Sequence, residues 1–487
     1  MPSILMIKPG WAEEIGFMHP ATPPLGILSL AAFVEKQRPG KYAFKVVDEK
    51  LGRLNHREWS DLLKEIKPDL VGISALSVEA TRSVELIRII KSFKPDLPVI
   101  MGGPYPTGAR ERALEWTGAD AVVAGEGEIP FLEILDYLLH NNSLDGLHVP
   151  GVLVRSRKIR DAAGYADMVM NLDELPRPAF DLLEIEHYFK MYRATTLDSG
   201  TRYLPVITSR GCPYACIYCH NSPGIAYRTM SAARVVQDLD WLARRYNLNE
   251  FEIMDDAFNL NRKRVLDICE GIRARGICTR FSFPNGLRGD ILDQTVISAL
   301  KSVGTYFIGF AIESASPRIQ EMIRKRIDFA RIEENINFAV SSGIFTIGFF
   351  MLGFPTETRK EMLKTVEYAL RSRLHLAFFF NVVPFEGTEL FDLVHGPEAV
   401  APGSERMLYD LQYAVHSLSE HVSSFELSAI QSAANILFYA QPSRIYRIFM
   451  DYPTSRLELL KSAMGFGFYM FWNRPRALLK QFVPRLK

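Results

Sequence analysis

The sequence predicts an α/β protein in three parts: a doubly wound, Rossmann-like parallel sheet, then a partial (β/α)6 barrel, then a small helical C-terminal region. Short apolar runs alternate with amphipathic segments over residues 1–140, and the same alternation returns over residues 201–395. Residues 141–200 lack a clear period and are expected to be a connector. From residue 396 to residue 487 the apolar spacing is helical. These four ranges are the expected domains.

In the front unit, strands are expected where short apolar runs stand between turn residues, and helices where apolar residues recur every three to four positions. The expected strands are Ile4–Ile7, Phe44–Asp48, Leu70–Ser74, Pro98–Met101 and Ala119–Val123. The expected helices are Gly26–Glu35, Asp61–Ile66 and Ala80–Phe93. Ligands bind beyond the carboxyl ends of such strands. The glycine-containing segments after Met101 and Val123 fall there, so we expect a ligand site at this edge.

In the second unit, six strand–helix pairs in series predict a closed or partly closed barrel. The expected strands are Leu204–Thr208, Glu250–Met254, Arg280–Phe283, Tyr306–Ile312, Phe345–Leu352 and Ala377–Val383. The expected helices are Ser231–Tyr246, Arg262–Arg275, Asp293–Val303, Pro317–Ile323, Phe329–Ser341 and Arg359–Ser372. Barrel active sites lie at the carboxyl ends of the strands, so the chemistry is expected there.

Composition limits the class of protein. The 487 residues are 48% hydrophobic and 23% charged with a net charge of +1, so no global field favours nucleic acid. The N-terminal residues show no secretion signal, and the longest apolar run, Ala463–Trp472, is about half of the ~20 residues that a spanning helix needs. Five cysteines, three of them bunched, argue against a disulfide framework. We expect a reducing, cytoplasmic setting.

The bunched cysteines are Cys212, Cys216 and Cys219, in a C-x3-C-x2-C pattern directly after the first barrel strand. Three thiolates can hold three irons of a 4Fe–4S cluster and leave the fourth iron open to a small molecule. Zinc and a disulfide are the alternatives. Zinc prefers four ligands, and His220, beside the last cysteine, is poorly placed to be the fourth.

This motif, with an aromatic residue before its last cysteine, resembles that of the radical S-adenosylmethionine (SAM) enzymes, and the resemblance covers about residues 203–394. It implies that the open iron binds the amino and carboxylate groups of SAM. Reductive cleavage then gives methionine and a 5′-deoxyadenosyl radical, which abstracts hydrogen from unactivated carbon. It also implies an external electron donor of the flavodoxin or ferredoxin type.

The resemblance also implies SAM contacts at the strand ends. Asp255 or Asp256 would accept from the SAM ammonium, although either could instead cap the following helix. Glu313 would bind the ribose hydroxyls, and Lys325 would meet the SAM carboxylate or lie on a solvated face. The other expected SAM contacts are Tyr218, Arg288, Ser314, Gly353, Val383 and Pro384. Of these, Tyr218 would pack beside the adenine, Gly353 lies in the segment Gly348–Glu357 that would pack on it, and Val383 and Pro384 would contact its edge.

Four segments of residues 1–140 stand out, namely Pro23–Gly26, Ile73–Ser77, Met101–Pro106 and Ala124–Glu128. In this order before such a barrel, they resemble the cobalamin-binding domain of the B12-dependent radical SAM class, which includes methyltransferases and the anaerobic Mg-protoporphyrin ester cyclase. The implied cobalamin contacts are Leu25, Gly26, Ser74, Leu76, Ser77, Gly102, Gly103, Pro104, Tyr105, Gly125, Glu126 and Gly127. The nucleotide tail would thread between sheet and helices, with glycines allowing close approach. The alternative is a flavodoxin-like domain that only docks on the barrel.

One departure concerns the lower face of the cobalt. Carriers that ligate cobalt from below use Asp-x-His-x-x-Gly, whereas the matching stretch here, Asp48–Gly52, has no histidine and its glycine comes one place early. His56 is the histidine near this stretch, and a loop histidine usually faces solvent. We therefore expect cobalamin without a lower histidine ligand.

The two units together imply methylation of an unactivated carbon of a small molecule, in which one SAM methylates the corrinoid and a second supplies the radical. A radical oxidative cyclase or ring rearrangement without methyl transfer is the first alternative. A non-enzymatic corrinoid carrier or sensor is the second, and the cysteine motif argues against it because a sensor needs no cleavable SAM.

The C-terminal region bears on the substrate. From Arg444 onward, nine Lys/Arg stand against two Asp/Glu and are interleaved with aromatic residues. Such a segment can lie on an anionic membrane, which would make a lipid substrate attractive, or it can pack on the barrel. Cys269 and Cys278 are expected to be small apolar residues rather than ligands of a second cluster. We expect a monomer.

Overall fold

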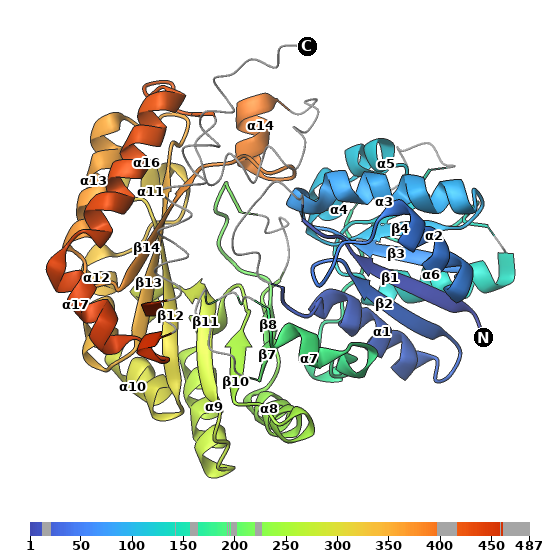
Figure 1. Ribbon diagram of the computed structural model, residues 1–487, viewed down its shortest axis with the longest axis horizontal. Helices are drawn as coiled ribbons and strands as arrows, with labels where there is room; N and C mark the ends of the chain where they lie inside the picture. The colour runs from blue at the N-terminus through green and yellow to red at the C-terminus, as the bar shows by residue number, and fades with distance from the viewer. Residues whose placement is uncertain are drawn as a thin grey trace.

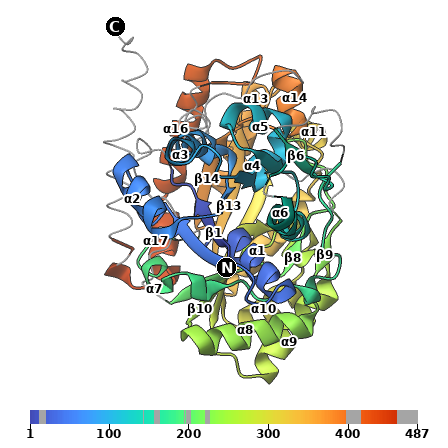
Figure 2. The same cartoon turned by 90° about the vertical axis from the view of Figure 1, so that its right-hand side faces the viewer.

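The computed structural model describes residues 1–11, 21–141, 143–155, 164–191, 193, 195, 202–219, 226–396, 416–457 and 459–460. Two α/β units lie side by side, the front unit in blue to cyan and the barrel in green to orange (Figure 1). Seen from the side of the front unit, its helices and strands lie over the barrel (Figure 2). The predicted order of units is therefore confirmed.

The front sheet has six strands in the order β2-β1-β3-β4-β5-β6. Their bounds are β1 Ser3–Lys8, β2 Ala43–Asp48, β3 Leu70–Ser74, β4 Val99–Gly102, β5 Ala121–Val123 and β6 Val152–Val154. The first five are parallel, as predicted, and β6 adds antiparallel to β5. The sequence analysis placed β6 within the connector. Three residues are too few to show a period, although all three are buried.

Helices cover both faces of this sheet. Their bounds are α1 Leu25–Gln37, α2 His56–Ile66, α3 Ala80–Phe93 with a preceding 3-10 turn at Ser77–Glu79, α4 Pro104–Ala109, α5 Glu111–Thr117 and α6 Glu128–Asn141. Helix α2 begins five residues before its predicted start at Asp61, because Asn55 caps it and Glu58 completes a capping box. Helices α4, α5 and α6 were not predicted from the sequence.

The alternation of side chains along β1 divides the core of the front unit. Ile4 and Met6 pack with α1 and α6 on one face, whereas Leu5 and Ile7 pack with α2, α3 and α5 on the other. Both faces of the sheet are therefore buried, as expected for a doubly wound sheet.

The second sheet is an open barrel of six parallel strands in the order β14-β13-β12-β11-β10-β7. The strands are β7 Tyr203–Val206, β10 Glu250–Ile253, β11 Arg280–Leu287, β12 Thr305–Glu313, β13 Phe345–Leu352 and β14 Leu376–Asn381. The helices that cover it are α8 Ala232–Tyr246, α9 Arg262–Ala274, α10 Gln294–Ser302, α11 Pro317–Met322, α12 Phe329–Ser341 and α13 Arg359–Arg371. All twelve predicted elements are present, with ends that differ by a few residues.

Smaller elements connect the main strands and helices. They are α7 Ile185–Tyr188, α14 Glu389–His395, the antiparallel pair β8 Ser209–Arg210 and β9 Arg228–Thr229, and 3-10 turns at Leu172–Glu174, Phe180–Leu182, Phe258–Leu260 and Gly289–Ile291. Helix α4 meets the loop after β14, where the backbones of Gly108 and Gly387 approach so closely that neither position has room for a Cβ.

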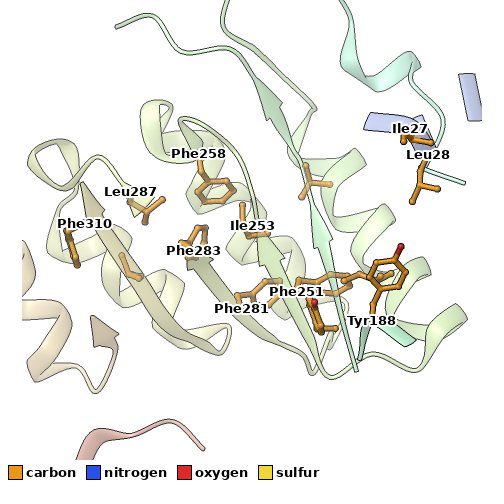
Figure 3. Close-up of a cluster of buried hydrophobic side chains, with 14 of the residues drawn as sticks. Ile27, Leu28, Tyr188, Phe251, Ile253, Phe258, Phe281, Phe283, Leu287 and Phe310 are labelled. Atoms are coloured by element: carbon orange, nitrogen blue, oxygen red, sulfur yellow. The ribbon is translucent and has the colours of Figure 1, made fainter. Parts of the chain in front are cut away.

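One apolar core is common to both units. It continues from Ile27 and Leu28 of α1 through Tyr188 of the connector to Phe251 of β10 and the rest of the barrel (Figure 3). The Tyr188 hydroxyl also donates a 2.9 Å hydrogen bond to Asp48 at the end of β2. The connector therefore belongs to the packed structure that joins the units.

The C-terminal helices α16 Ser424–Tyr439 and α17 Pro442–Asp451 pack against the barrel. Gln431 donates to the Phe379 carbonyl of β14 at 2.7 Å, and buried Arg444 donates to the Leu370 carbonyl at the end of α13 at 2.9 Å. This part of the tail therefore follows the packing alternative, while residues 461–487 lie outside the described residues. No helix in the described part of the chain is long and apolar enough to cross a membrane.

Candidate functional site

The cysteine loop begins where β7 ends, at the mouth of the barrel. Cys212 and Cys216 are half-buried, Cys219 is exposed, and none of the three forms a disulfide. Among the described residues, no three Cys, His, Asp or Glu side chains converge to hold a single metal ion. A 4Fe–4S cluster takes one thiolate per iron, so three thiols spread along one loop fit it better than they fit zinc. Burial raises the pKa of Cys216, and nearby Lys325 opposes that rise.

Buried Asp255 fastens the start of this loop. One carboxylate oxygen accepts from the Thr208 amide, and the other accepts from the Thr208 and Ser209 hydroxyls, each at 2.6 Å. Burial raises its pKa, and the hydrogen bonds from Ser209 and Thr208 oppose that rise. Both oxygens are thus engaged by the scaffold. The predicted contact of Asp255 with SAM stays a prediction.

Neither aspartate of the pair caps the following helix. The cap of α9 is Asn261, whose side chain accepts from the Arg264 amide. The capping alternative is therefore wrong. Asp256 is exposed and lies in the lining of the cavity between the two units. Burial of its surroundings and repulsion by Asp255 raise its pKa. Of the two carboxylates, Asp256 is the one directed at open space.

Glu313 ends β12 in an unusual backbone conformation. Its φ is +66°, and the register with β13 shifts between Ala311 and Glu313. The bulge turns the carboxylate toward Lys325, whose Nζ lies 2.8 Å from it, and toward the Tyr218 hydroxyl at 3.4 Å. Lys325 is buried, so it does not lie on a solvated face. The structure thus brings three predicted SAM contacts together beside the cysteine loop.

Arg288 contacts the cysteine loop through the ring of Tyr214. Its guanidinium forms an ion pair with Asp290 at 3.0 Å, donates to the Lys325 carbonyl at 2.8 Å, and lies 3.7 Å above the ring of Tyr214. Tyr214 stands between the first two cysteines in the sequence. Arg288 therefore connects the segment after α11, which carries Lys325, with the loop that carries the cysteines.

The strand ends expected to meet adenine are tightly packed. Gly353 has φ +95°, and a Cβ there would lie 2.8 Å from Leu427 of α16. Its amide donates at 2.8 Å to Glu357, the buried last residue of the segment expected to pack on adenine, whose pKa burial raises to about 8. The ring of Tyr218 packs edge-on against Phe354 at 6.1 Å. The aromatic residue of the cysteine motif and the end of β13 thus share one cluster.

The other residues predicted for this area face neighbours. Ser314 is fully buried, and its hydroxyl lies 3.3 Å from that of Thr365 on α13. Val383 and Pro384 are buried after β14. Their roles at the adenine edge remain predictions.

A cavity lies between the carboxyl edge of the front sheet and the first barrel strand. Side chains of the front unit, such as Met6 of β1 and Phe131 of α6, line one wall, and barrel residues including Thr208 and Met254 line the other. The predicted cobalamin contacts that line it are Leu25, Gly26, Ser74, Gly102, Gly103, Gly125, Glu126 and Gly127.

The remaining predicted cobalamin contacts are not in this lining. Leu76 and buried Ser77 lead into α3, Pro104 is exposed at the start of α4, and Tyr105 is buried edge-on against Trp116 at 6.2 Å. These four positions therefore lie at the starts of helices, outside the lining of the cavity.

The glycines of the cavity lining allow the close backbone approach that a corrinoid needs. Gly103 has φ +98°, and a Cβ there would lie 2.9 Å from the Ala75 carbonyl oxygen. Only glycine therefore suits this position at the edge of the sheet. The lining also includes apolar side chains of α1 and of the sheet, among them Leu30 and Ile100. His56 is exposed at the start of α2, away from this lining, and Lys50 pairs with Glu79 at 3.1 Å.

A group of ion pairs joins the two units beside the cavity, and the sequence analysis missed it. Arg210 contacts Glu126 at 2.9 Å and Glu128 at 2.7 Å, and Arg228 also binds Glu126. Glu126 was predicted to contact cobalamin, but in this structure its carboxylate binds two arginines of the barrel unit. Partners 84 and 82 residues apart give no local sequence signal.

Comparison with known proteins agrees with both units. Residues 206–369 match the radical SAM superfamily, and residues 19–135 match the B12 binding domain. An uncharacterized methyltransferase of Pyrococcus horikoshii is 32% identical over 444 residues, which cover 90% of this chain and 93% of that protein. Cytidylyl-2-hydroxyethylphosphonate methyltransferase of Streptomyces wedmorensis is 28% identical over 457 residues, 84% of each chain.

A solved structure shares the fold. TsrM from Kitasatospora setae, a radical SAM methyltransferase with cobalamin and a 4Fe–4S cluster bound, superposes with a TM-score of 0.67 at 17% identity. The match covers 92% of each chain, so it includes both α/β units.

Proposed function

The chain belongs to the cobalamin-dependent radical SAM enzymes of the methyltransferase type, and from this membership we propose that it methylates an unactivated carbon of a small, apolar substrate. The observation that supports the proposal most is the cavity between the units. It puts the glycine-rich edge of the front sheet against the residues that lead into the cysteine loop. A methyl donor held in front would then face a radical made in the barrel.

The thiolates of Cys212, Cys216 and Cys219 would hold the cluster, and the glycine-rich edge would hold the corrinoid. When bound, these groups supply a 5′-deoxyadenosyl radical from SAM and a transferable methyl group. The chain itself orients SAM: Glu313 offers an acceptor to the ribose, Lys325 offers a cation to the carboxylate, and Tyr218 offers a ring beside the adenine. Asp256 is the carboxylate open to the SAM ammonium.

The inner face of the barrel supports an apolar substrate. Phe349 of β13 and Phe378 and Phe380 of β14 are half-buried, and their ring centroids lie 5.8 to 6.4 Å apart. Their strand neighbours Phe350 and Phe379 point the other way, into the core beneath the helices. Three partly open aromatic rings favour a ligand with a flat or greasy surface.

Anaerobic reconstitution with iron, sulfide and hydroxocobalamin tests the reaction. With dithionite, methyl-labelled SAM and the small-molecule fraction of a strain lacking the gene, we expect 5′-deoxyadenosine, methionine and S-adenosylhomocysteine, with the label in a carbon-bound methyl group. Cys216→Ala should abolish all of these products. Cys278→Ala, at an exposed position away from the motif, should leave them unchanged. Release of 5′-deoxyadenosine without S-adenosylhomocysteine or label would support cyclisation, and absence of both products would support a carrier.

Membrane contact is a separate part of the proposal. Residues 461–487 contain six Lys/Arg and no Asp/Glu, and exposed Tyr446 and Leu460 precede them. We propose that this segment brings the enzyme to anionic lipid, which would suit a lipid substrate. The full chain should co-sediment with phosphatidylserine vesicles, and a chain ending at residue 460 should not. Equal sedimentation of both forms would remove the argument.

A further inference from the structure

Arg210 occupies a special position between the two proposed cofactor sites. It ends β8, pairs in register with Arg228 of β9, and is separated from Cys212 by Gly211 alone. Gly211 has φ +81°, a conformation that favours glycine. The cysteine loop therefore begins directly after a backbone position that the β8–β9 pairing holds in place.

The side chain of Arg210 leaves the barrel and enters the front unit. Its two terminal nitrogens contact Glu126 at 2.9 Å and Glu128 at 2.7 Å, on either side of Gly127. Glu128 also accepts from the Ser29 hydroxyl of α1 at 2.8 Å. Arg210 therefore holds in two places the acidic loop Glu126–Glu128, which leads into α6, and this loop is tied in turn to α1.

Arg228 completes the arrangement. It binds Glu126 and donates to the Val169 carbonyl of the connector at 2.5 Å. Two guanidinium groups thus balance two carboxylates, and the side chains of Arg228 and Glu128 are only 5% exposed. Moving one member of such a buried ion pair leaves the charge of the other buried and unpaired, which is energetically costly. The four side chains are therefore expected to move together or not at all.

The same residues line the proposed corrinoid cavity. Ser29, Glu126, Glu128, Arg210 and Gly211 all contribute to its wall. A Cβ at Gly127 would lie 2.9 Å from Leu30 of α1, so this turn is packed directly on the helix. A ligand that fills the cavity therefore contacts the loop that Arg210 holds, and its binding affects the position of that loop.

We propose that Arg210 is a positioning residue that couples corrinoid binding in the front unit to SAM binding at the cluster, through its bonds to Glu126 and Glu128. This inference rests on the proposed function. Filling the cavity fixes the acidic loop, the loop fixes Arg210, and Arg210 fixes the start of the cysteine loop. Because such coupling is reciprocal, SAM at the cluster tightens the corrinoid by the same factor.

The test measures that factor in the reconstituted enzyme. The dissociation constant of SAM is obtained from the change it causes in the EPR spectrum of the reduced cluster, with and without saturating hydroxocobalamin. The reverse titration follows corrinoid absorbance with and without SAM. We expect hydroxocobalamin to tighten SAM binding about tenfold in the unmodified enzyme. In Arg210→Lys, which keeps the charge but loses the two-pronged contact, the factor should fall below about twofold.

Two further variants make the result specific. Glu126→Gln removes the partner on the front side and should lose the coupling in the same way, so it carries the test if Arg210→Lys loads iron poorly. Arg245→Gln removes an exposed pair between α8 and Asp181 and should keep the full factor. Iron, sulfide and corrinoid content of each variant shows whether both cofactors are present.

The outcomes separate the inference from the proposed function. An Arg210→Lys or Glu126→Gln enzyme that holds both cofactors and keeps the full factor overturns the inference, as does an unmodified enzyme that binds both without coupling. An unmodified chain that takes up neither cofactor overturns the proposed function as well.

Discussion

Replacing Asp255 with asparagine separates two roles for this carboxylate. In the structure it holds the start of the cysteine loop with three hydrogen bonds of 2.6 Å. The asparagine carbonyl can keep the bond from the Thr208 amide. Its NH2 group then replaces the oxygen that accepted from two hydroxyls, and an NH2 group cannot accept. The substitution therefore weakens the hydrogen bonds that hold the cysteine loop, while the side chain keeps nearly the same size.

The expected cost follows from these bonds. A hydrogen bond to a charged group contributes about 1.5 to 3 kcal/mol, against about 1 kcal/mol for a neutral one. The two hydroxyls can rotate to accept from the NH2 group, so three charge-assisted bonds become neutral at a cost of about 3 kcal/mol, and relief of the buried charge lowers this to about 1 to 2 kcal/mol. Asp255→Ala leaves a buried amide and two hydroxyls without their acceptor, so it should cost about 3 to 5 kcal/mol.

The assay combines stability with cofactor content. Urea unfolding of the apo protein gives the free-energy change, and iron and sulfide analysis after anaerobic reconstitution gives the occupancy of the loop. We expect Asp255→Asn to lower both, while the loaded fraction binds SAM within about threefold of the parent. Asp256→Asn should do the opposite, with stability unchanged and SAM binding weakened about tenfold for one lost charge-assisted contact. If Asp255→Asn keeps its stability and iron but loses SAM affinity, Asp255 is a ligand and the scaffold argument is wrong.

Three further expectations concern the same barrel. Gly353→Ala places a Cβ 2.8 Å from Leu427 at φ +95°, and should cost about 2 to 4 kcal/mol in urea unfolding; trimming Leu427 to alanine should not relieve the backbone part. Burial lowers the pKa of His375 from 6.5 to about 4, so its contribution is complete above pH 6.5 and is lost as pH falls toward 4. We expect about 2 kcal/mol less stability near pH 5 than near pH 7, and a smaller difference in His375→Gln. Glu313→Gln leaves Lys325 without its anion and should weaken SAM binding at least about tenfold, by EPR titration; an unchanged affinity would contradict the ribose role.

The sequence predicted most of the fold because most elements carry their own signal. Helices α3 and α12 and strand β13 have the predicted bounds, since continuous apolar or amphipathic runs mark them from end to end. Helices α4 and α5 are only six and seven residues long, which is too short for a 3.6-residue period to appear. Strand β6 is defined by its pairing with β5, which is a contact that the local sequence of β6 does not reveal.

The site was predictable in identity more than in geometry. The cysteine spacing marked the loop, and Glu313 and Lys325 were identified by position. What aims Glu313 is a bulge and a positive φ, which depend on how β12 pairs with β13. The contacts of Arg210 could not be read from the sequence either, because they join residues that only the complete fold brings together.

The common core has a consequence for how the molecule comes apart. Because one apolar core continues from α1 through Tyr188 to Phe251, separating the front unit from the barrel would expose apolar surface on both. Local opening of either unit exposes the apolar surface of the other, so both should melt in a single cooperative transition. Hydrogen exchange should then slow in the barrel strands when a corrinoid is added at the front, because the ligand draws its stabilisation from the whole structure rather than from one half.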